Sequence, residues 1–79
     1  MKVIVNIQLK EGVLDPQGKA VSHALLALKF NEVQNVRVGK QIILDLEGDD
    51  EEKAFKRVEE MCEELLANTV IETYNIEIV

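Results

Sequence analysis

The sequence predicts an α+β domain in which two helices cover one face of a four-stranded antiparallel sheet. Both ends of the chain alternate polar and apolar residues, which is typical of strands with one buried face. The segments 16–29 and 49–68 instead repeat apolar residues at helical spacing. The stretch between them is typical of two further strands, and the 79-residue chain, 1–79, is expected to form one domain.

The first strand is expected at KVIVNIQLK, Lys2–Lys10. One side of this strand is polar, and the other side is apolar and consists of Val3, Val5, Ile7 and Leu9. Ile4 is the one apolar residue on the polar side. The odd-numbered side is therefore expected to face the core, with Ile4 outside it.

The first helix is expected from Pro16 to about Lys29. Asp15 is a good N-cap, and proline suits the first helical position because its missing N–H would have no helical acceptor there. The stripe that would face the sheet consists of Val21, Ala24, Leu25 and Leu28. Leu26 lies far round the helix from this stripe, on the side of His23, so a single domain would expose it.

A hairpin is expected at NVRVGKQIILDLEG, with a tight turn at Gly39 and Lys40. The side chains that would face the helices are Val36, Val38, Ile42, Leu44 and Leu46. Arg37 and Lys40 make the turn basic in an acidic protein. Such a turn suits either simple hairpin geometry or contact with a partner.

The second helix opens with carboxylates that suit a helix N-terminus, and Asn68 is a reasonable left-handed cap at its end. Its apolar stripe consists of Ala54, Phe55, Val58, Met61, Cys62, Leu65 and Leu66. The last strand, TVIETYNIEIV, alternates polar residues with inward-facing Tyr74, Ile76 and Ile78. The order βαββαβ indicates the ferredoxin-like arrangement, with both helices on one face of the sheet. Its open face would carry Ile4 and Ile43 among polar side chains.

Charge and composition narrow the classes of partner. Nine basic and fifteen acidic residues give a net charge of -6, which repels nucleic-acid phosphates and anionic lipid headgroups. No stretch approaches the roughly 20 apolar residues of a membrane span. A single cysteine allows no disulfide framework. We therefore expect a cytoplasmic protein with neither nucleic acid nor membrane as a partner.

No set of residues predicts catalysis on this chain. Cys62 falls within the apolar stripe of the second helix, which favours a core residue. The only histidine, His23, points away from the core, so a Cys62–His23 pair would need one side chain to face the wrong way. The four glycines form no phosphate-binding pattern, and magnesium binding by the acidic clusters would be nonspecific. No catalytic, cofactor-binding or metal-binding residue is assigned.

Three segments together resemble one known family. LDPQGKAVSHAL, NEVQNVRVGK and EMCEELLANTVIETY are similar, in order and spacing, to PurS, the small subunit of phosphoribosylformylglycinamidine synthase. The likeness spans nearly the whole chain. It implies a non-catalytic subunit that forms a homodimer or a dimer of dimers and joins a PurL-type synthetase subunit and a PurQ-type glutaminase subunit.

In that family the complex uses ATP, Mg²⁺ and glutamine to convert formylglycinamide ribonucleotide to formylglycinamidine ribonucleotide in purine biosynthesis. The small subunit bridges the glutaminase and synthetase sites, between which ammonia must pass. The resemblance thus implies an accessory subunit of a ligase, without a cofactor of its own. The candidate contacts with partners or with other copies of the chain are Ile4, His23, Leu26, Arg37, Lys40 and Ile43.

Other functions share the predicted topology. A stand-alone enzyme of the acylphosphatase type needs an Arg and an Asn in a phosphate-binding loop after the first strand, and KEGVLDPQG supplies neither. An RNA-recognition module is disfavoured by the acidic charge and by the missing aromatic residues on the central strands. A ferredoxin-like regulatory module that binds a small molecule at a subunit interface stays open.

Overall fold

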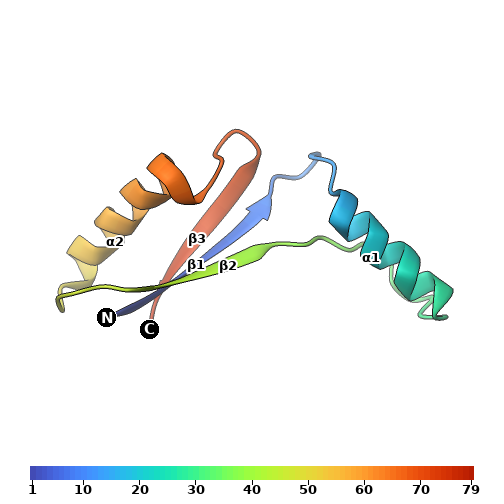
Figure 1. The fold of residues 1–79 in the computed structure, drawn as a ribbon, viewed down its shortest axis with the longest axis horizontal. Helices are drawn as coiled ribbons and strands as arrows, with labels where there is room; N and C mark the ends of the chain where they lie inside the picture. Colours follow the sequence, from blue (N-terminus) through green and yellow to red (C-terminus); the bar gives the residue numbers. More distant parts are fainter.

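A three-stranded antiparallel sheet forms the centre of the molecule. The computed structural model describes all 79 residues and places β1 (Lys2–Leu9) between β2 (Lys40–Asp45) and β3 (Glu72–Ile78), so the strand order is β2-β1-β3 (Figure 1). The alternation in β1 has the predicted effect, because Val3, Val5 and Ile7 are all buried. The two termini lie side by side at one end of the sheet, where the Val79 N–H donates to the Lys2 carbonyl.

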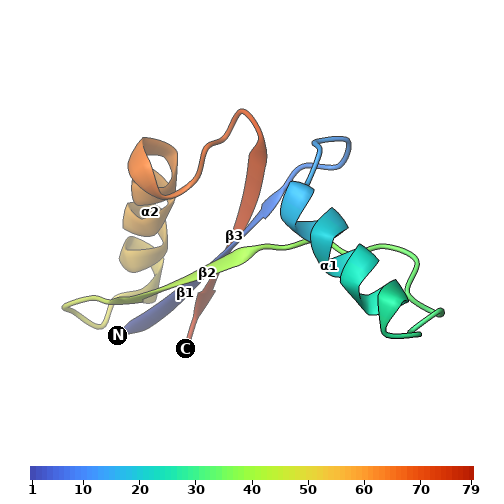
Figure 2. The same cartoon turned by 45° about the vertical axis from the view of Figure 1, so that its right-hand side comes forward.

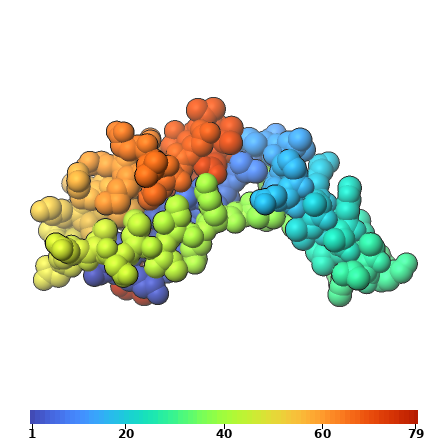
Figure 3. All heavy atoms as spheres, in the orientation of Figure 1, coloured from blue at the N-terminus to red at the C-terminus, as the bar shows by residue number.

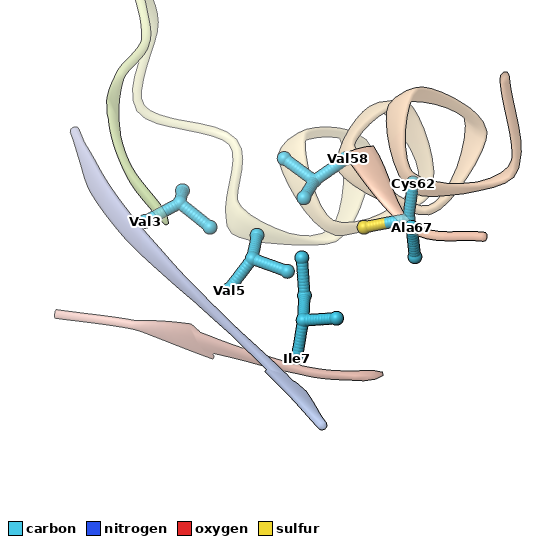
Figure 4. Close-up of a cluster of buried hydrophobic side chains, with 6 residues drawn as sticks. All are labelled: Val3, Val5, Ile7, Val58, Cys62 and Ala67. Carbon is cyan, nitrogen blue, oxygen red and sulfur yellow. The ribbon is translucent and has the colours of Figure 1, made fainter. Parts of the chain in front are cut away.

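Helix α2 (Glu51–Met61) packs on the apolar face of the sheet, over β1 and β3. Asp50 caps the helix by accepting a hydrogen bond from the Lys53 N–H, and its first turn carries the acidic residues that the positive end of the helix favours. Figure 4 shows the resulting core, in which Val58 and Cys62 face the apolar side of β1. The prediction that Cys62 belongs to the core is confirmed.

The end of the second helix differs from the prediction. The chain continues from α2 into a π-helical turn, η1 (Cys62–Leu66), which holds one residue more per hydrogen-bonded turn than an α-helix. The extra residue changes which side chains face the sheet, and Leu65 is 82% exposed instead of buried. Phe55 is 39% exposed. Asn68 is not left-handed, and its side chain instead accepts a hydrogen bond from the Val70 N–H.

Helix α1 (Pro16–Ala27) is capped by Asp15 as predicted, but it does not lie on the sheet. It projects away from the sheet, at the opposite end of the molecule from α2, in both ribbon views (Figures 1 and 2). The molecule measures 49 × 25 × 14 Å with a radius of gyration of 16.0 Å, whereas a compact domain of this length would have about 12 Å. We call α1 with the segment 28–39 the arm, and the sheet with α2 and η1 the body.

The prediction of a four-stranded sheet with a hairpin at Gly39 and Lys40 is wrong. Residues 33–39 form no strand, and they return from the far end of the arm to the start of β2. A helix of 12 residues is about 18 Å long, and the segment 33–38 at about 3.3 Å per residue covers about 20 Å. Since α1 points outward, the whole of this segment is needed to bring the chain back. The observed fold is α+β, with two helices and three strands.

Candidate functional site

The open face of the sheet, on the side away from α2, carries two of the predicted contact residues. Ile4 on β1 and Ile43 on β2 are paired across the antiparallel ladder, so the structure brings them together. Ile43 is 54% exposed. The rest of this face is polar and cross-linked, because Asn6 donates to Asn75 and to a carboxylate on β3 and accepts from a glutamine on β2. A small apolar spot therefore sits in an ordered polar surface.

The arm carries a larger uncovered apolar surface, part of which was predicted to face the sheet. Val21, on the stripe predicted to face the sheet, is 43% exposed, the same as Leu26, which was predicted to be outside it. Leu26 is therefore exposed as predicted, but so are Val21, Ala24 and Leu28 of the stripe, while Leu25 is partly buried. His23 is also exposed on α1. The large exposed apolar residues of the arm and of the turn before it are Leu14, Val21, Leu26, Leu28 and Phe30.

The body has a groove beside α2, along the connection from β2. Its lining combines Leu46, Ala54 and Met61 with a glycine and five charged residues: Glu47, Asp49, Asp50, Lys53 and Arg57. Ile42 and Leu44 of β2, on the same face of the sheet, remain only partly buried. Space-filling atoms show the body and the arm as two masses with a hollow between them (Figure 3). The arm of the same chain therefore leaves this half of the sheet without a covering helix.

Arg37 lies where the arm joins the body, and its side chain donates hydrogen bonds to two backbone carbonyls of the same chain. Its Nη1 donates to the Val13 carbonyl at 2.9 Å, and its Nη2 donates to the Lys10 carbonyl at 3.0 Å. Lys40, nearby at the start of β2, places its Nζ 3.4 Å from the Glu72 carboxylate. Both basic residues are exposed, yet each already has an intramolecular partner. They do not form a hairpin turn.

The carboxylate of Asp15 was predicted only as a helix cap, and sequence reasoning missed its second role. One oxygen accepts from the Gly18 N–H and the other from the Val38 N–H, both at 2.8 Å. The Val38 bond is the largest influence that holds the pKa of Asp15 below its ordinary value, followed by the Gly18 bond, with a further contribution from the Arg37 charge. The residue type could have indicated this second role, because a carboxylate has two oxygens and can accept more hydrogen bonds than a helix cap requires.

The remaining titratable groups form no catalytic constellation. Burial raises the pKa of the Cys62 thiol, and the neighbouring carboxylates of Glu63 and Glu59 raise it further, so the unreactive thiol form is favoured. His23 is on the arm and Cys62 faces the core of the body, so the pair lies apart. A hydrogen bond to Glu63 raises the pKa of Tyr74 to about 12. No group of three or more His, Cys, Asp or Glu side chains is placed to hold a metal ion.

The predicted contact residues thus occupy three separate places. Ile4 and Ile43 share the open sheet face, His23 and Leu26 lie on α1, and the two basic residues lie where the arm meets the body. No helix of the molecule is both long enough and apolar enough to span a bilayer.

Comparison with known proteins identifies the family of the chain. The family model PurS, described as phosphoribosylformylglycinamidine (FGAM) synthase, matches residues 2–79. The phosphoribosylformylglycinamidine synthase subunit PurS of Bacillus subtilis (strain 168) is 56% identical over 77 residues, which cover 98% of this chain and 90% of that protein.

Solved structures of relatives share the fold. The crystal structure of Methanocaldococcus jannaschii PurS, one of the subunits of formylglycinamide ribonucleotide amidotransferase in the purine biosynthetic pathway, has a TM-score of 0.87 at 47% identity, covering 96% of this chain and 92% of that one. PurLQS from Thermotoga maritima contains a chain with a TM-score of 0.87 at 37% identity, covering 96% and 93%. The match of the family model and of these relatives over nearly the full length shows that the chain belongs to the PurS family of phosphoribosylformylglycinamidine synthase subunits.

Proposed function

We propose that this chain is the non-catalytic bridge of a phosphoribosylformylglycinamidine synthase complex. The single observation that carries this proposal is the uncovered apolar arm on a chain without any catalytic constellation. Exposed apolar surface of this kind marks a site of contact with another protein. The chain therefore contributes contacts to the complex, while the reacting groups belong to other subunits.

The partners proposed for the chain are a PurL-type synthetase subunit and a PurQ-type glutaminase subunit in the cytoplasm. The structure of PurLQS from Thermotoga maritima, which contains a relative of this chain, supports such an assembly. In it, glutamine would supply ammonia, and ATP with Mg²⁺ would drive the amidation of formylglycinamide ribonucleotide at the synthetase. ATP, Mg²⁺ and glutamine are thus assigned to the complex, and no cofactor is assigned to this chain.

A second copy of the chain is the partner proposed for the apolar stripe of α1. The stripe of one copy would lie in the groove beside α2 of the other, over Ile42 and Leu44. Two helices would then cover each three-stranded sheet, one from the same chain and one from the second copy. Burial of Val21 and Leu28 in this way removes apolar surface from water, and a homodimer is the smallest assembly that does so. A dimer of dimers would use the open sheet face in addition.

The larger subunits are proposed to meet the surfaces that such a dimer leaves free. Leu26 and His23 lie off the stripe of α1, and Ile4 with Ile43 forms the apolar spot on the open sheet face. Arg37 and Lys40 lie between these surfaces and remain exposed beside their intramolecular partners, so they too are candidates for this contact. An apolar centre with a polar and charged rim is the usual composition of a non-obligate interface.

Omission of the chain from a reconstituted complex tests the bridging role. The synthetase and glutaminase subunits are supplied with the ribonucleotide, ATP and Mg²⁺, and product formation from glutamine is compared with that from free ammonium. We expect omission to abolish the glutamine-dependent reaction and to leave the ammonium-dependent one. If neither rate changes, the bridging role is wrong, and the regulatory module that binds a small molecule takes its place, to be tested by calorimetry with purine intermediates and amino acids.

A further inference from the structure

The arm is joined to the body by two short segments that are tied to each other. The outgoing segment runs from Lys10 to Asp15, and the returning segment runs from Val36 to Gly39; we call the two together the arm root. Gly12 lies in the outgoing segment with a φ of 85°, a conformation that few other residues adopt. If these two segments were not bonded to each other, the arm could swing relative to the sheet.

The guanidinium of Arg37 ties the returning segment to the outgoing one and, through it, to the body. Its two donors reach the carbonyls of Val13 and Lys10 at 2.9 and 3.0 Å. The N–H of Lys10 in turn donates to the Ile71 carbonyl at 2.8 Å, directly before β3. Because a planar guanidinium donates in fixed directions, two bonds from one side chain fix orientation as well as distance.

The carboxylate of Asp15 makes the second tie, in the opposite direction. It belongs to the outgoing segment, caps α1 through the Gly18 N–H and accepts from the Val38 N–H of the returning segment. Asp15 is only 5% exposed, so water competes little for these two bonds. The first turn of α1 is therefore fixed to the segment that leads into β2.

Close backbone packing makes the arm root rigid. A Cβ at Gly18 would overlap the Val36 carbonyl oxygen, so the returning segment lies directly against the first turn of α1. A Cβ at Gly39 would come within 2.8 Å of the Ile7 carbonyl oxygen, so the same segment also lies directly against β1. The hydrogen-bond ties thus act across contacts that leave little room for motion.

We propose that Asp15 and Arg37 are positioning residues that fix the direction of the arm relative to the sheet. The direction of the arm determines how far a protein bound to α1 lies from one bound to the body. In a bridging subunit this separation sets the register of the glutaminase and synthetase sites, a consequence that rests on the function proposed above. Asp15 and Arg37 touch no reactant. Asp15 is buried and acts only through the direction of the arm, whereas Arg37 is in addition a candidate for direct contact with the larger subunits.

Spin-label distances test the direction of the arm itself. The full chain carries labels at Asn31→Cys on the arm and Glu52→Cys on α2, with Cys62→Ala to remove the native thiol, and is mixed with excess unlabelled chain so that only distances within one copy are read. We expect one narrow distance. Unchanged widths in both variants described next would overturn the proposal.

Two variants and one control separate the ties from simple loss of folding. Asp15→Asn keeps the cap, because the amide oxygen accepts from the Gly18 N–H, but its NH₂ group cannot accept from the Val38 N–H. Arg37→Met keeps the apolar stem and loses both donors. Each should broaden the distance distribution at least about twofold, whereas Lys56→Met, on the exposed side of α2, should not broaden it.

The same variants in the assembled complex test the functional consequence. Complexes of equal subunit composition are compared, and the ratio of glutamine-dependent to ammonium-dependent turnover should fall roughly tenfold for Asp15→Asn and Arg37→Met, because a misplacement of about 1 Å has large effects on coupled sites. Arg37→Lys, which can donate to one of the two carbonyls, should restore part of the ratio.

A broadened arm with an unchanged ratio would overturn the functional part of the proposal. Failure of the bridging role shows separately, since omission of the whole chain would then leave glutamine-dependent turnover intact. In that case the spin-label widths alone decide whether Asp15 and Arg37 hold the arm. The two failures are therefore distinguishable.

Discussion

The body of this molecule buries its apolar residues within the chain, whereas the arm exposes them to water. In the body, strand β1 buries Val3, Val5 and Ile7 beneath Val58 and Cys62, so the apolar residues are covered within one chain. In the arm, α1 has equally apolar residues and leaves them in water. The difference teaches that a stripe of helical spacing predicts burial, but does not say which chain supplies the cover.

The largest expected difference between the two regions is in folding stability. Ile7→Ala, in the body, should lower the free energy of unfolding by about 2–5 kcal/mol, because it leaves a cavity at a fully covered site. Leu28→Ala, in the arm, shortens a side chain of similar size that is already exposed to solvent. It should lower the free energy of unfolding by less than about 0.5 kcal/mol in a dilute sample. Urea denaturation at low protein concentration measures both. Equal costs would mean that the arm is part of a common core.

Self-association should depend on the stripe of α1. Leu28→Glu places a carboxylate in the proposed groove of a second copy and should weaken association of two copies at least about 30-fold, or roughly 2 kcal/mol. Sedimentation equilibrium measures the change, and the circular dichroism spectrum should stay that of the folded chain. Gln34→Glu adds the same charge at an exposed position of the segment 28–39 and serves as the control.

Leu26→Glu should distinguish contact with the larger subunits from association of two copies, because Leu26 lies off the stripe of α1. Two copies of this variant should associate normally, while co-elution with the synthetase and glutaminase subunits weakens. Normal co-elution would remove Leu26 from the proposed contact with the larger subunits. Dissociation of the copies themselves would instead place Leu26 in the homodimer interface.

A smaller effect is expected for Cys62. Cys62→Ala should lower the free energy of unfolding by roughly 1 kcal/mol through a small cavity in the body. Turnover of the assembled complex should remain nearly intact, because the thiol is buried and held in its protonated form. Complete loss of turnover in a folded, assembled Cys62→Ala complex would contradict the structural role and reopen a nucleophilic one.

Acid should loosen the arm root, whereas neutral pH should leave it intact. The pKa of Asp15 is lower in the folded chain than in the unfolded one, so the stability it contributes is present above the unfolded pKa of about 3.9 and is lost as the pH falls through the lowered value. The difference in unfolding free energy between the unmodified chain and Asp15→Asn should therefore shrink in acid. A difference that stays constant down to acid pH would show that ionisation of Asp15 does not matter.

Tyr74 on β3, at the edge of the body, is expected to show its hydrogen bond in an absorbance titration rather than in folding stability. Tyr74 is the only tyrosine and there is no tryptophan, so its phenolate absorbance can be followed alone. While circular dichroism shows a folded chain, the phenolate should form at a pKa of about 12, because Glu63 accepts the hydroxyl hydrogen bond. Glu63→Ala should return the pKa toward its ordinary value near 10. Identical titrations would contradict the hydrogen bond.

The sequence predicted local structure well where one chain decides it. The alternation of β1 and β3, the Asp15 cap, the start of α2 and the burial of Cys62 depend on neighbouring residues and on the periodicity of side chains, and all are found. The resemblance to PurS, based on three segments spread along the chain, is confirmed over residues 2–79.

The errors in the arm have a common physical origin. Val21 and Leu28 were assigned to a core because no sequence pattern distinguishes cover by the same chain from cover by another. Once α1 points outward, residues 33–39 must return to the sheet, so the expected fourth strand cannot form. Leu65 was misplaced for a different reason, since a π-turn shifts the helical register by one residue and has no clear mark in the sequence.

Hydrogen exchange over a dilution series, in the isolated chain and in the assembled complex, tests most directly whether the body stands alone while the arm depends on partners. Amides of β1 should be protected to the same degree in both, whereas amides of α1 should exchange rapidly in the dilute chain and slowly in the complex. If α1 is as protected as β1 in the dilute chain, or gains no protection on assembly, the arm is not the surface through which this subunit joins others.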